Sequence, residues 1–447
     1  MFSKKLLGVI VIAIIVLAVG GYYAYQQYFA PKPELIIYHY YTAGGEREAI
    51  DVYFKYFKER YPDIVVRENE VPGGAARDIR VVVMSRLEAG NPPDIFLDLA
   101  GANLKRYVDA GYLAPVDDVW EETDLIEHVP KLLAKMCYFY GHYYGVPANN
   151  VHRENLLFYN KHIFDELGVK PPTTPEELLE VCRIIKEKKP NVYPIVMSTK
   201  DYWHVAFFFD PLIYYYGGKT MDERTEYYLN FFTGRVDLTK PEEAEPLRKA
   251  LEFVKVLIEN GYLVPSNAWT WDETCALIAE GKAAMGMYGD WALGYFLARG
   301  LKCDVDFHAV PLPGGDYEVY LIGVDAFVMP EGCPHPDVAK LWLKLISEPQ
   351  IAYEFAIKKG SIAARDDAPA EYPDSIRREN IRFLKEHPEL VIPHGTFMLA
   401  PPAFLEDFCK AIISFFDHKD VSKAVSDIVA LMEKHKVREF SEWFWKE

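Results

Sequence analysis

The chain of 447 residues lacks the short motifs that mark many catalytic and nucleotide-binding sites. It has no G-x-S-x-G turn, no G-x-x-x-x-G-K-S/T phosphate loop, no G-x-G-x-x-G loop and no H-E-x-x-H helix. Basic residues are in the minority, with 49 Lys and Arg against 66 Asp and Glu and a net charge of −17. An acidic chain without a Lys/Arg-rich run is a poor match for phosphates, so nucleic acid is not an expected partner.

Cysteine is also sparse, and its spacing argues against a metal cluster. None of the six cysteines forms a C-x-x-C pair, and the histidines show no ligand spacing, so we expect no metal or other cofactor. An even number of cysteines allows up to three disulfide bridges in an oxidising compartment, and buried free thiols are the equal alternative. The six are Cys137, Cys182, Cys275, Cys303, Cys333 and Cys409.

One long hydrophobic run is present, at the N-terminus. Lys4 and Lys5 precede an apolar stretch from Leu6 to Val19, and about twenty uncharged residues are enough to cross a hydrocarbon core of roughly 30 Å. No A-x-A cleavage site follows the run, which favours an uncleaved anchor over a cleaved signal peptide. Residues 1–30 are therefore predicted to be a transmembrane signal anchor and spacer at the cell membrane, with the rest of the chain on the extracellular face.

Strands and helices alternate at the start of the remaining chain. The patterns predict strands over 35–41, 64–71 and 94–98, with helices beginning near 46, 76 and 102. This alternation is typical of an α/β fold with a parallel sheet and helices on its faces. Further along, helical segments are expected to about residue 298, strands over 307–311 and 320–329, and a mostly helical stretch over 404–445.

Polar and aromatic residues close the first and third predicted strands. In an open parallel sheet the ligand crevice lies at the carboxyl ends of the strands, which places Tyr40, Tyr41, Asp98 and Asn103 along one edge. Neighbouring aromatic and acidic residues recur at Trp271-Asp272 and Asp290-Trp291. Sugars offer a flat face for stacking and hydroxyls for carboxylates, so these neighbours favour a carbohydrate ligand. Core packing of the rings is the alternative, and Asp290 is also a candidate cap for the helix after it.

Several stretches resemble a known family in order and spacing. They are ELIIYHYY (34–41), PPDIF (92–96), GVPANNVHREN (145–155), LFYNK (157–161), GKAAM (281–285), GDWALGY (289–295), KGSIAAR (359–365) and PHG (393–395). Together they resemble the family 1 extracellular solute-binding proteins, the maltose-binding-protein-like receptors of carbohydrate-uptake ABC transporters. The resemblance is strongest to the branch that binds glucose and galactose.

That resemblance implies a two-lobed periplasmic-binding-protein-like (type II) fold. One lobe is expected over 34–146 and 312–357, the other over 147–311 and 358–447, so that the strand at 307–311 becomes a return crossing between them. Such proteins trap a solute by hinge closure and deliver it to a membrane permease. The implied ligand is a monosaccharide such as glucose or galactose, or a short oligosaccharide, and no catalytic step is expected.

The resemblance also suggests which side chains hold the sugar. Tyr40 and Tyr41 stand where the glucose-binding branch has tryptophans, and Leu99 beside Asp98 stands where it has a histidine. Asn150 and His152 lie just past the first expected hinge crossing, where hinge hydrogen bonding is the alternative to ligand contact. Glu46 is equally well explained as a first-turn charge. The candidate substrate-binding residues are Tyr40, Tyr41, Glu46, Asp98, Asn150, His152, Trp271, Asp290, Trp291, Lys359 and His394.

Two other functions stay open at this point. Pairs of catalytic carboxylates meet only in the folded chain, so a membrane-anchored extracellular glycoside hydrolase is one rival. A binder of peptides or other small solutes on the same fold is the second, because fold alone does not fix the ligand.

Overall fold

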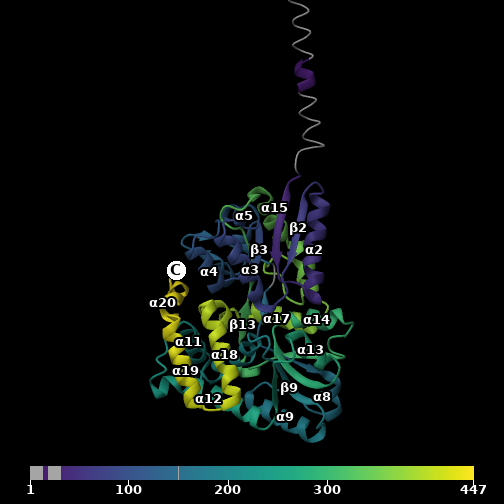
Figure 1. Ribbon diagram of the computed structural model, residues 1–447. Helices are drawn as coiled ribbons and strands as arrows, with labels where there is room; N and C mark the ends of the chain where they lie inside the picture. Colours follow the sequence, from purple (N-terminus) through teal and green to yellow (C-terminus); the bar gives the residue numbers. More distant parts are fainter. Residues whose placement is uncertain (1–13, 19–31, 149–150, 447) are drawn as a thin grey trace, which may run out of the picture.

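The computed structural model describes residues 14–18, 32–148 and 151–446. Two five-stranded sheets, each covered by helices, organise the described chain (Figure 1). The first sheet has the order β2 (Val65–Glu70), β1 (Glu34–His39), β3 (Ile95–Leu99), β14 (Asp325–Val328) and β6 (Val146–Pro147). The second has the order β10 (Leu263–Ser266), β9 (Tyr193–Ser198), β11 (Ala283–Tyr288), β8 (Leu156–Asn160) and β12 (Phe307–Pro311).

Both sheets are mixed rather than parallel throughout. β1 runs parallel to β2 and β3, as the alternating pattern predicts, but β14 runs antiparallel to β3 and β6. In the second sheet β8 runs antiparallel to both β11 and β12. The prediction of a parallel sheet is therefore right for the first three strands and wrong for those that arrive from distant parts of the sequence.

A third, small sheet contains the segments that pass between the two larger ones. Its order is β15 (Val391–Pro393), β13 (Tyr320–Gly323) and β7 (His152–Arg153). The apolar run at 320–329, predicted as one strand, divides at Val324: β13 belongs to the small sheet and β14 to the first sheet. The expected return crossing at 307–311 is wrong, because β12 is an edge strand of the second sheet and the chain re-enters the first sheet at β14.

Helices cover the sheets and fill the remainder of the described chain. The helices before β4 are α2 (Gly45–Arg60), α3 (Arg77–Glu88), α4 (Ala102–Asp109), α5 (Asp117–Glu122), α6 (Leu125–His128) and α7 (Lys131–Met136). A hairpin of β4 (Tyr138–Phe139) and β5 (His142–Tyr143) follows them. The later helices are α8 (Lys161–Leu167), α9 (Pro175–Lys188), α10 (His204–Tyr216), α11 (Met221–Phe232), α12 (Pro241–Glu259), α13 (Trp271–Ala279), α14 (Ala292–Ala298), α15 (Pro336–Ile346), α16 (Pro349–Lys359), α17 (Ser375–Glu386), α18 (Pro402–His418), α19 (Val421–Lys434) and α20 (Val437–Ser441).

Short turns of tighter or wider helix complete the list of elements. They are η1 (Gly74–Ala76), η2 (Gly315–Tyr317), η3 (Pro388–Leu390), the π-turn η4 (Gly395–Leu399) and η5 (Glu442–Trp445). Strands β8, β9, β10 and β11 fall inside the stretch predicted as helical up to residue 298. All five residues of β8 are buried, so it lacks the alternating polar pattern by which a strand is recognised in a sequence.

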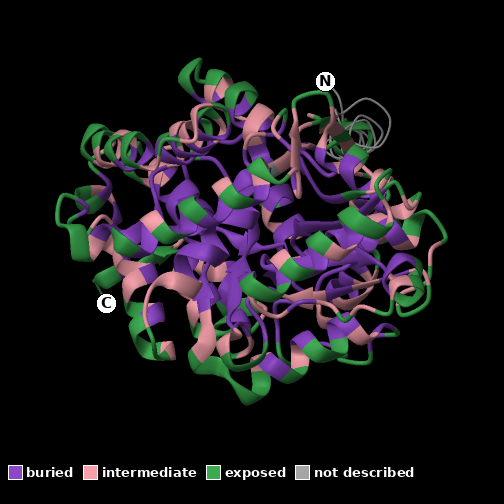
Figure 2. Cartoon of the chain, turned by 90° about the horizontal axis from the view of Figure 1, so that it is seen from below, coloured by how far each residue is buried: buried purple, intermediate pink, exposed green. Residues whose placement is uncertain are grey.

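The core beneath the first sheet is built from aromatic rings. Tyr53 of α2 stacks on Phe355 of α16 with ring centroids 4.3 Å apart, and Trp342 of α15 meets Tyr53 edge to face. Burying each such ring contributes about 1.5–3 kcal/mol, which fixes α15 and α16 against α2 although some 300 residues separate them in sequence. Figure 2 shows buried positions filling the centre of the chain, with exposed positions around its rim.

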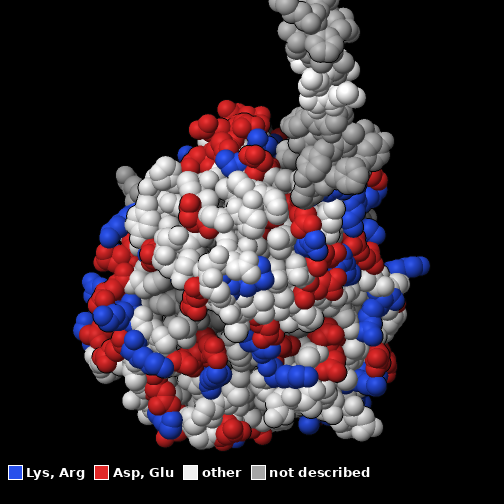
Figure 3. Space-filling model, turned by 45° about the horizontal axis from the view of Figure 1, so that its top comes forward, with Lys and Arg blue, Asp and Glu red and all other residues white. Residues whose placement is uncertain are grey.

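The surface carries both signs of charge in small groups. On the face shown in Figure 3, Lys and Arg are interspersed with Asp and Glu. Many ion pairs join helical neighbours, and Arg183 pairs with both Glu180 and Glu187. Exposed pairs of this kind contribute little to stability individually.

The structure bears on two further predictions, the disulfide bridges and the N-terminal membrane anchor. All six cysteines lie in the described residues and all are free, so the disulfide alternative is wrong. Among the residues that the structure describes, no helix has both the length and the hydrophobicity to span a bilayer. The anchor predicted over residues 1–30 lies outside the described residues, apart from 14–18.

Candidate functional site

A pocket opens where the first sheet, the second sheet and the crossing strands meet. Counting open solvent at its mouth, it encloses about 640 Å³. The first sheet and its helices supply Tyr40, Thr42, Ala43, Glu46, Gly73, Gly74, Leu99 and Asp325; β7 and the residue after it supply His152 and Glu154; other segments supply Trp203, Phe207, Trp271, Trp291, Lys359, Phe397 and Met398.

A buried histidine between two carboxylates forms the polar floor of the pocket. His152 Nδ1 lies 2.7 Å from Asp290 Oδ1, and His152 Nε2 lies 3.5 Å from Asp325 Oδ2. Burial disfavours the charged ring, but the hydrogen bonds to Asp290 and Asp325 outweigh it and raise the pKa of His152 to about 9. The ring therefore carries a positive charge at neutral pH.

Asp325 is the carboxylate that faces the pocket from β14. The phenols of Tyr40 and Tyr41 donate to its two oxygens at 2.6 and 2.5 Å. Burial alone raises the pKa of Asp325, but the hydrogen bond and charge of His152 outweigh burial and hold this pKa well below its usual range. Asp325 is thus a permanent anion in which each oxygen already accepts a phenol.

Glu154 is a second buried carboxylate in the pocket wall. Its Oε2 accepts a hydrogen bond from Trp291 Nε1 at 3.1 Å. Two glycines make room for it: a Cβ at Gly289 or at Gly323 would lie 2.1 Å from a Glu154 oxygen. Burial raises the pKa of Glu154 to about 7, so it is an acceptor or a donor according to pH near neutrality.

A buried ion pair closes the side of the pocket next to the first sheet. Lys359 ends α16 with 2 % of its side chain exposed, and its Nζ donates to Glu46 Oε1 at 2.7 Å. The ammonium also lies 4.6 Å from the ring centroid of Tyr41. The chain can leave the helix directly after Lys359 because Gly360 adopts φ 94°, which L side chains rarely do.

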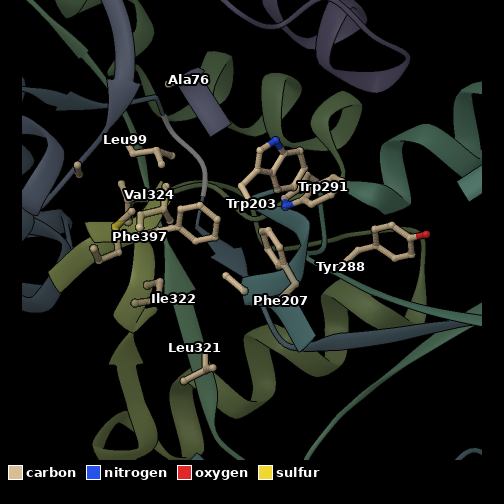
Figure 4. Packing of buried hydrophobic residues seen from close by; sticks show 14 of the residues in the cluster. Ala76, Leu99, Trp203, Phe207, Tyr288, Trp291, Leu321, Ile322, Val324 and Phe397 are labelled. Carbon is tan, nitrogen blue, oxygen red and sulfur yellow. The ribbon is translucent and has the colours of Figure 1, made fainter. Parts of the chain in front are cut away.

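Aromatic rings cover the opposite wall. Trp271 and Trp291 meet edge to face with centroids 4.9 Å apart, and Trp291 also contacts Trp203 and Phe207. Figure 4 shows Trp203 and Phe207, both from the start of α10, packed close to Trp291 and Phe397 from two other segments. Trp271 is held as the first residue of α13, where a Thr270–Glu273 capping box fixes the helix start and its backbone N–H donates to Asp201.

The structure brings six of the eleven candidate residues to the pocket. Tyr40, Glu46, His152, Trp271, Trp291 and Lys359 line it. Tyr41 and Asp290 lie one layer behind and contact lining residues through hydrogen bonds. Asn150 lies outside the described residues.

Asp98 faces away from the pocket. It forms a buried ion pair with Arg80, with Nη2 2.7 Å from Oδ1, and accepts a hydrogen bond from Tyr107. Successive side chains of a strand point to opposite faces, and it is Leu99, the next residue of β3, that lines the pocket.

His394 is fully buried next to Asp210, with Nδ1 3.1 Å from Oδ2. Burial lowers the pKa of His394 to about 3, so the ring is neutral. Asp210 accepts hydrogen bonds from the backbone and hydroxyl of Thr396 in the following π-turn, η4. This arrangement holds η4, which delivers Phe397 and Met398 to the pocket.

Asp290 does not have the capping role considered for it. In the described part of the chain no side chain caps α14, and the Asp290 carboxylate accepts from His152 and from the backbone N–H of Arg153. Its place is thus behind the histidine rather than at the helix end.

Sequence reasoning missed Asp325, Glu154, Trp203, Phe207 and Phe397. Asp325 leaves a signal, because it is the one charged residue in the apolar run 320–329 and a buried carboxylate requires partners. Glu154 belongs to the stretch 145–155 that carries the resemblance. The three rings leave no signal that separates them from core residues.

The fold and the pocket between two sheet-based units define the class as a two-domain α/β solute-binding protein. The solved structure of a bacterial solute receptor described as having an exclusive preference for β-D-galactopyranose has this fold, with a TM-score of 0.77, 18% identity, and coverage of 91% of this chain and 99% of the other. A chitin oligosaccharide binding protein matches with a TM-score of 0.75 at 18% identity, over 91% of this chain and 99% of its own.

The family model of the bacterial extracellular solute-binding proteins matches residues 43–353, and the chain belongs to that family. It is similar to an uncharacterized ABC transporter extracellular-binding protein of Pyrococcus horikoshii, with 38% identity over 92% of this chain and 90% of the relative. A probable sugar-binding periplasmic protein of Rhizobium meliloti is 26% identical over 90% and 94%. A xylose/arabinose-binding protein of Haloferax volcanii is 25% identical over 81% and 76%.

Proposed function

We propose that the protein is the sugar-binding component of an ABC importer, which captures a monosaccharide or short oligosaccharide and delivers it to a membrane permease. The observation that carries the proposal is the composition of the pocket. Tryptophan rings form one wall, and three acidic side chains, Glu46, Glu154 and Asp325, stand with Lys359 and the charged His152 around the rest. Relatives named for sugar binding support the same ligand class.

The chemistry of each group suggests its role toward a sugar. Trp271 and Trp291 would stack on the apolar face of the ring, a contact that contributes about 1 kcal/mol beyond area burial. Glu154 and Glu46 would accept sugar hydroxyls, and Lys359 and His152 would donate to sugar oxygens; each bond to a charged group contributes about 1.5–3 kcal/mol. Tyr40 donates to Asp325, while Tyr41 and Asp290 would position Asp325 and His152 from behind.

The proposed division of the chain into two lobes rests on the family resemblance and on the arrangement of the sheets. We assign residues 34–146 and 324–357 to one lobe and 147–311 and 358–447 to the other; residues 312–323, which contain β13 of the small sheet, pass between them, and the hinge closes over the sugar. Strands β7 and β13 of the small sheet, which pair antiparallel, would serve as part of the hinge.

Delivery to a permease requires the receptor to stay on the outer face of the membrane. The run from Leu6 to Val19 supports a tether, with Lys4 and Lys5 on the cytoplasmic side. Because the stretch Pro31–Pro33 is short, the binding lobes would be held close to the membrane surface.

A ligand panel tests the proposal. The full chain is mixed with monosaccharides, disaccharides and trisaccharides, and in parallel with amino acids and short peptides, and thermal unfolding is followed by tryptophan fluorescence. A ligand that binds only the folded state raises the unfolding temperature. We expect at least one sugar to do so; stabilisation by amino acids or peptides alone would contradict the proposal.

The hydrolase alternative is separated by product analysis. Asp325 has both oxygens engaged by Tyr40 and Tyr41, which leaves a poor nucleophile or base. Overnight incubation with oligosaccharides and aryl glycosides should therefore leave them intact. Release of reducing ends or aglycone would favour the hydrolase.

A further inference from the structure

Three side chains of metal-ligating type converge at the start of β12, and none of them lines the pocket. Cys303, Asp304 and His308 each offer a ligand atom, and these atoms lie within 4.8 Å of one another. The loop leads into β12, the outer strand of the second sheet. A thiol, an imidazole and a carboxylate form a donor set that zinc binds readily, whereas hard cations such as Mg²⁺ prefer oxygen alone.

The distances within the trio are close to those of a tetrahedral zinc site. With a Zn–S bond of about 2.3 Å and Zn–N and Zn–O bonds of about 2.0 Å, tetrahedral angles place sulfur and nitrogen about 3.5 Å apart and nitrogen and oxygen about 3.3 Å apart. Cys303 Sγ lies 3.9 Å from His308 Nδ1, and His308 Nδ1 lies 3.0 Å from Asp304 Oδ1. Side-chain movements of a few tenths of an ångström would complete the geometry.

The loop backbone holds the three side chains in place. Asp304 donates its N–H to the carbonyl of Phe307 at 2.9 Å, and Cys303 forms a bridge with the same residue. These bonds fold the chain back so that Cys303 and His308 meet across the turn. The site is therefore largely preformed.

A second-sphere partner comes from another element. Ser375, the first residue of α17, donates its hydroxyl to Asp304 Oδ1 at 2.7 Å, and its Oγ lies 3.9 Å from Cys303 Sγ. Hydrogen bonds of this kind orient a ligating carboxylate. With three protein ligands, the fourth position would be left to water, as in other open zinc sites.

We propose that Cys303 and Asp304, from the loop before β12, and His308, the second residue of β12, form a zinc-binding site that is linked to the start of α17 through Ser375. Zinc binds the thiolate, so the thiol proton leaves to the solvent when the metal enters. The spacing Cys-Asp-x-x-x-His is not a C-x-x-C pattern, which is why cysteine spacing alone argued against a metal. The site is independent of the sugar pocket, since none of its residues lines that pocket.

Cobalt spectroscopy on the intact protein tests the site. The full chain is treated with EDTA, desalted and titrated with Co²⁺, which reports a thiolate ligand by a charge-transfer band in the near ultraviolet. We expect one Co²⁺ per chain with that band, and displacement by one equivalent of Zn²⁺. Since Cys303 is the only one of the six cysteines that is not buried, Zn²⁺ should also slow its alkylation at least tenfold.

Substitutions distinguish metal binding at this site from metal binding elsewhere on the chain. Cys303→Ser should abolish the band, and His308→Gln should weaken Co²⁺ binding at least tenfold. The matched control is His162→Gln, which removes a neighbouring exposed histidine paired with Asp306 and should leave titration unchanged. Far-ultraviolet circular dichroism confirms that each variant is folded.

Three outcomes would overturn the proposal. One is a folded wild-type chain that gives no thiolate band and no protection of Cys303. Another is binding without the band, which would place the metal at a different cluster such as His128 with Asp366 and Asp367. The last is equal weakening by His162→Gln and His308→Gln, which would indicate adventitious surface binding.

Discussion

Replacing Asp290 by Asn tests whether the positive charge of His152 in the pocket depends on a carboxylate that does not itself line the pocket. The substitution keeps the shape of the side chain and removes its charge. Asp290 is fully buried and its Oδ1 lies 2.7 Å from His152 Nδ1, so no solvent replaces the lost interaction. We expect the pKa of His152 to fall from about 9 toward its ordinary value of 6.5.

The size of the effect follows from the difference between those pKa values. A shift from 6.5 to about 9 corresponds to about 3 kcal/mol at most. Because the folded-state pKa is raised, this stabilisation is fully present below pH 6.5 and is lost as pH rises through 9. Wild-type stability should therefore decline over that interval on account of His152, and the decline should be smaller in Asp290→Asn.

The affinity for sugar should also depend on the positive charge of His152. If the imidazolium donates to the sugar, Asp290→Asn should lower affinity at least tenfold at pH 8, and less at pH 6, where the ring is still protonated. Isothermal titration calorimetry at pH 6, 7, 8 and 9 measures this, and thermal unfolding at each pH measures stability. Glu154 also titrates near pH 7 in the pocket, so the comparison is the difference between variant and wild type at each pH.

A matched control removes a carboxylate from an exposed histidine. Glu389→Gln changes the partner of His387, where both side chains are about half exposed, and should alter neither affinity nor the pH profile. If Asp290→Asn has the same affinity and the same pH dependence as wild type while Glu389→Gln behaves as expected, the coupling of Asp290 to the pocket through His152 is refuted.

Three further predictions concern the pocket walls and the thiols. Glu154→Gln should remove a titration near pH 7: the raised pKa makes the wild type lose stability as pH rises from 4.5 through 7, and the variant should be flatter in chemical denaturation over that range. Trp271→Ala should weaken sugar binding severalfold or more in calorimetry, since it removes both stacking and buried area, whereas Trp445→Ala, at a ring 39% exposed near the C-terminus, should not. Thiol titration should count six free cysteines in the unfolded chain, and in the native chain Cys303 should react before the five buried thiols; mass spectrometry that finds a disulfide would contradict this.

Local pattern was sufficient for much of the first sheet. The strands at 34–39, 65–70 and 95–99 and the helices between them lie within a few residues of their predicted positions. β1 alternates buried and half-buried residues and the helices bury one face, so both show a clear apolar period, whereas β3 is buried along its whole length. The same reasoning failed for β8 and β11, which are buried along their whole length and show no alternation.

The site was predictable only in part, for a related reason. Trp271, Lys359 and Glu46 stood out through the resemblance, and the structure places all three at the pocket. Asp98 and His394 looked equally suitable, yet strand alternation turns Asp98 toward Arg80, and packing against Asp210 encloses His394. The sequence alone does not show which face of a strand lines a cavity, because this depends on the residues that pack around the strand.

The amino-acid sequence by itself determined the class of elements, the acidic balance of the chain and the family to which it belongs, because these depend on composition and on short-range order. Only the tertiary structure decided that Asp325 meets Tyr40, Tyr41 and His152, that Glu154 fits between two glycines, and that Cys303, Asp304 and His308 converge. Such juxtapositions depend on strand pairing and loop geometry, and both are set by the packing of the whole chain.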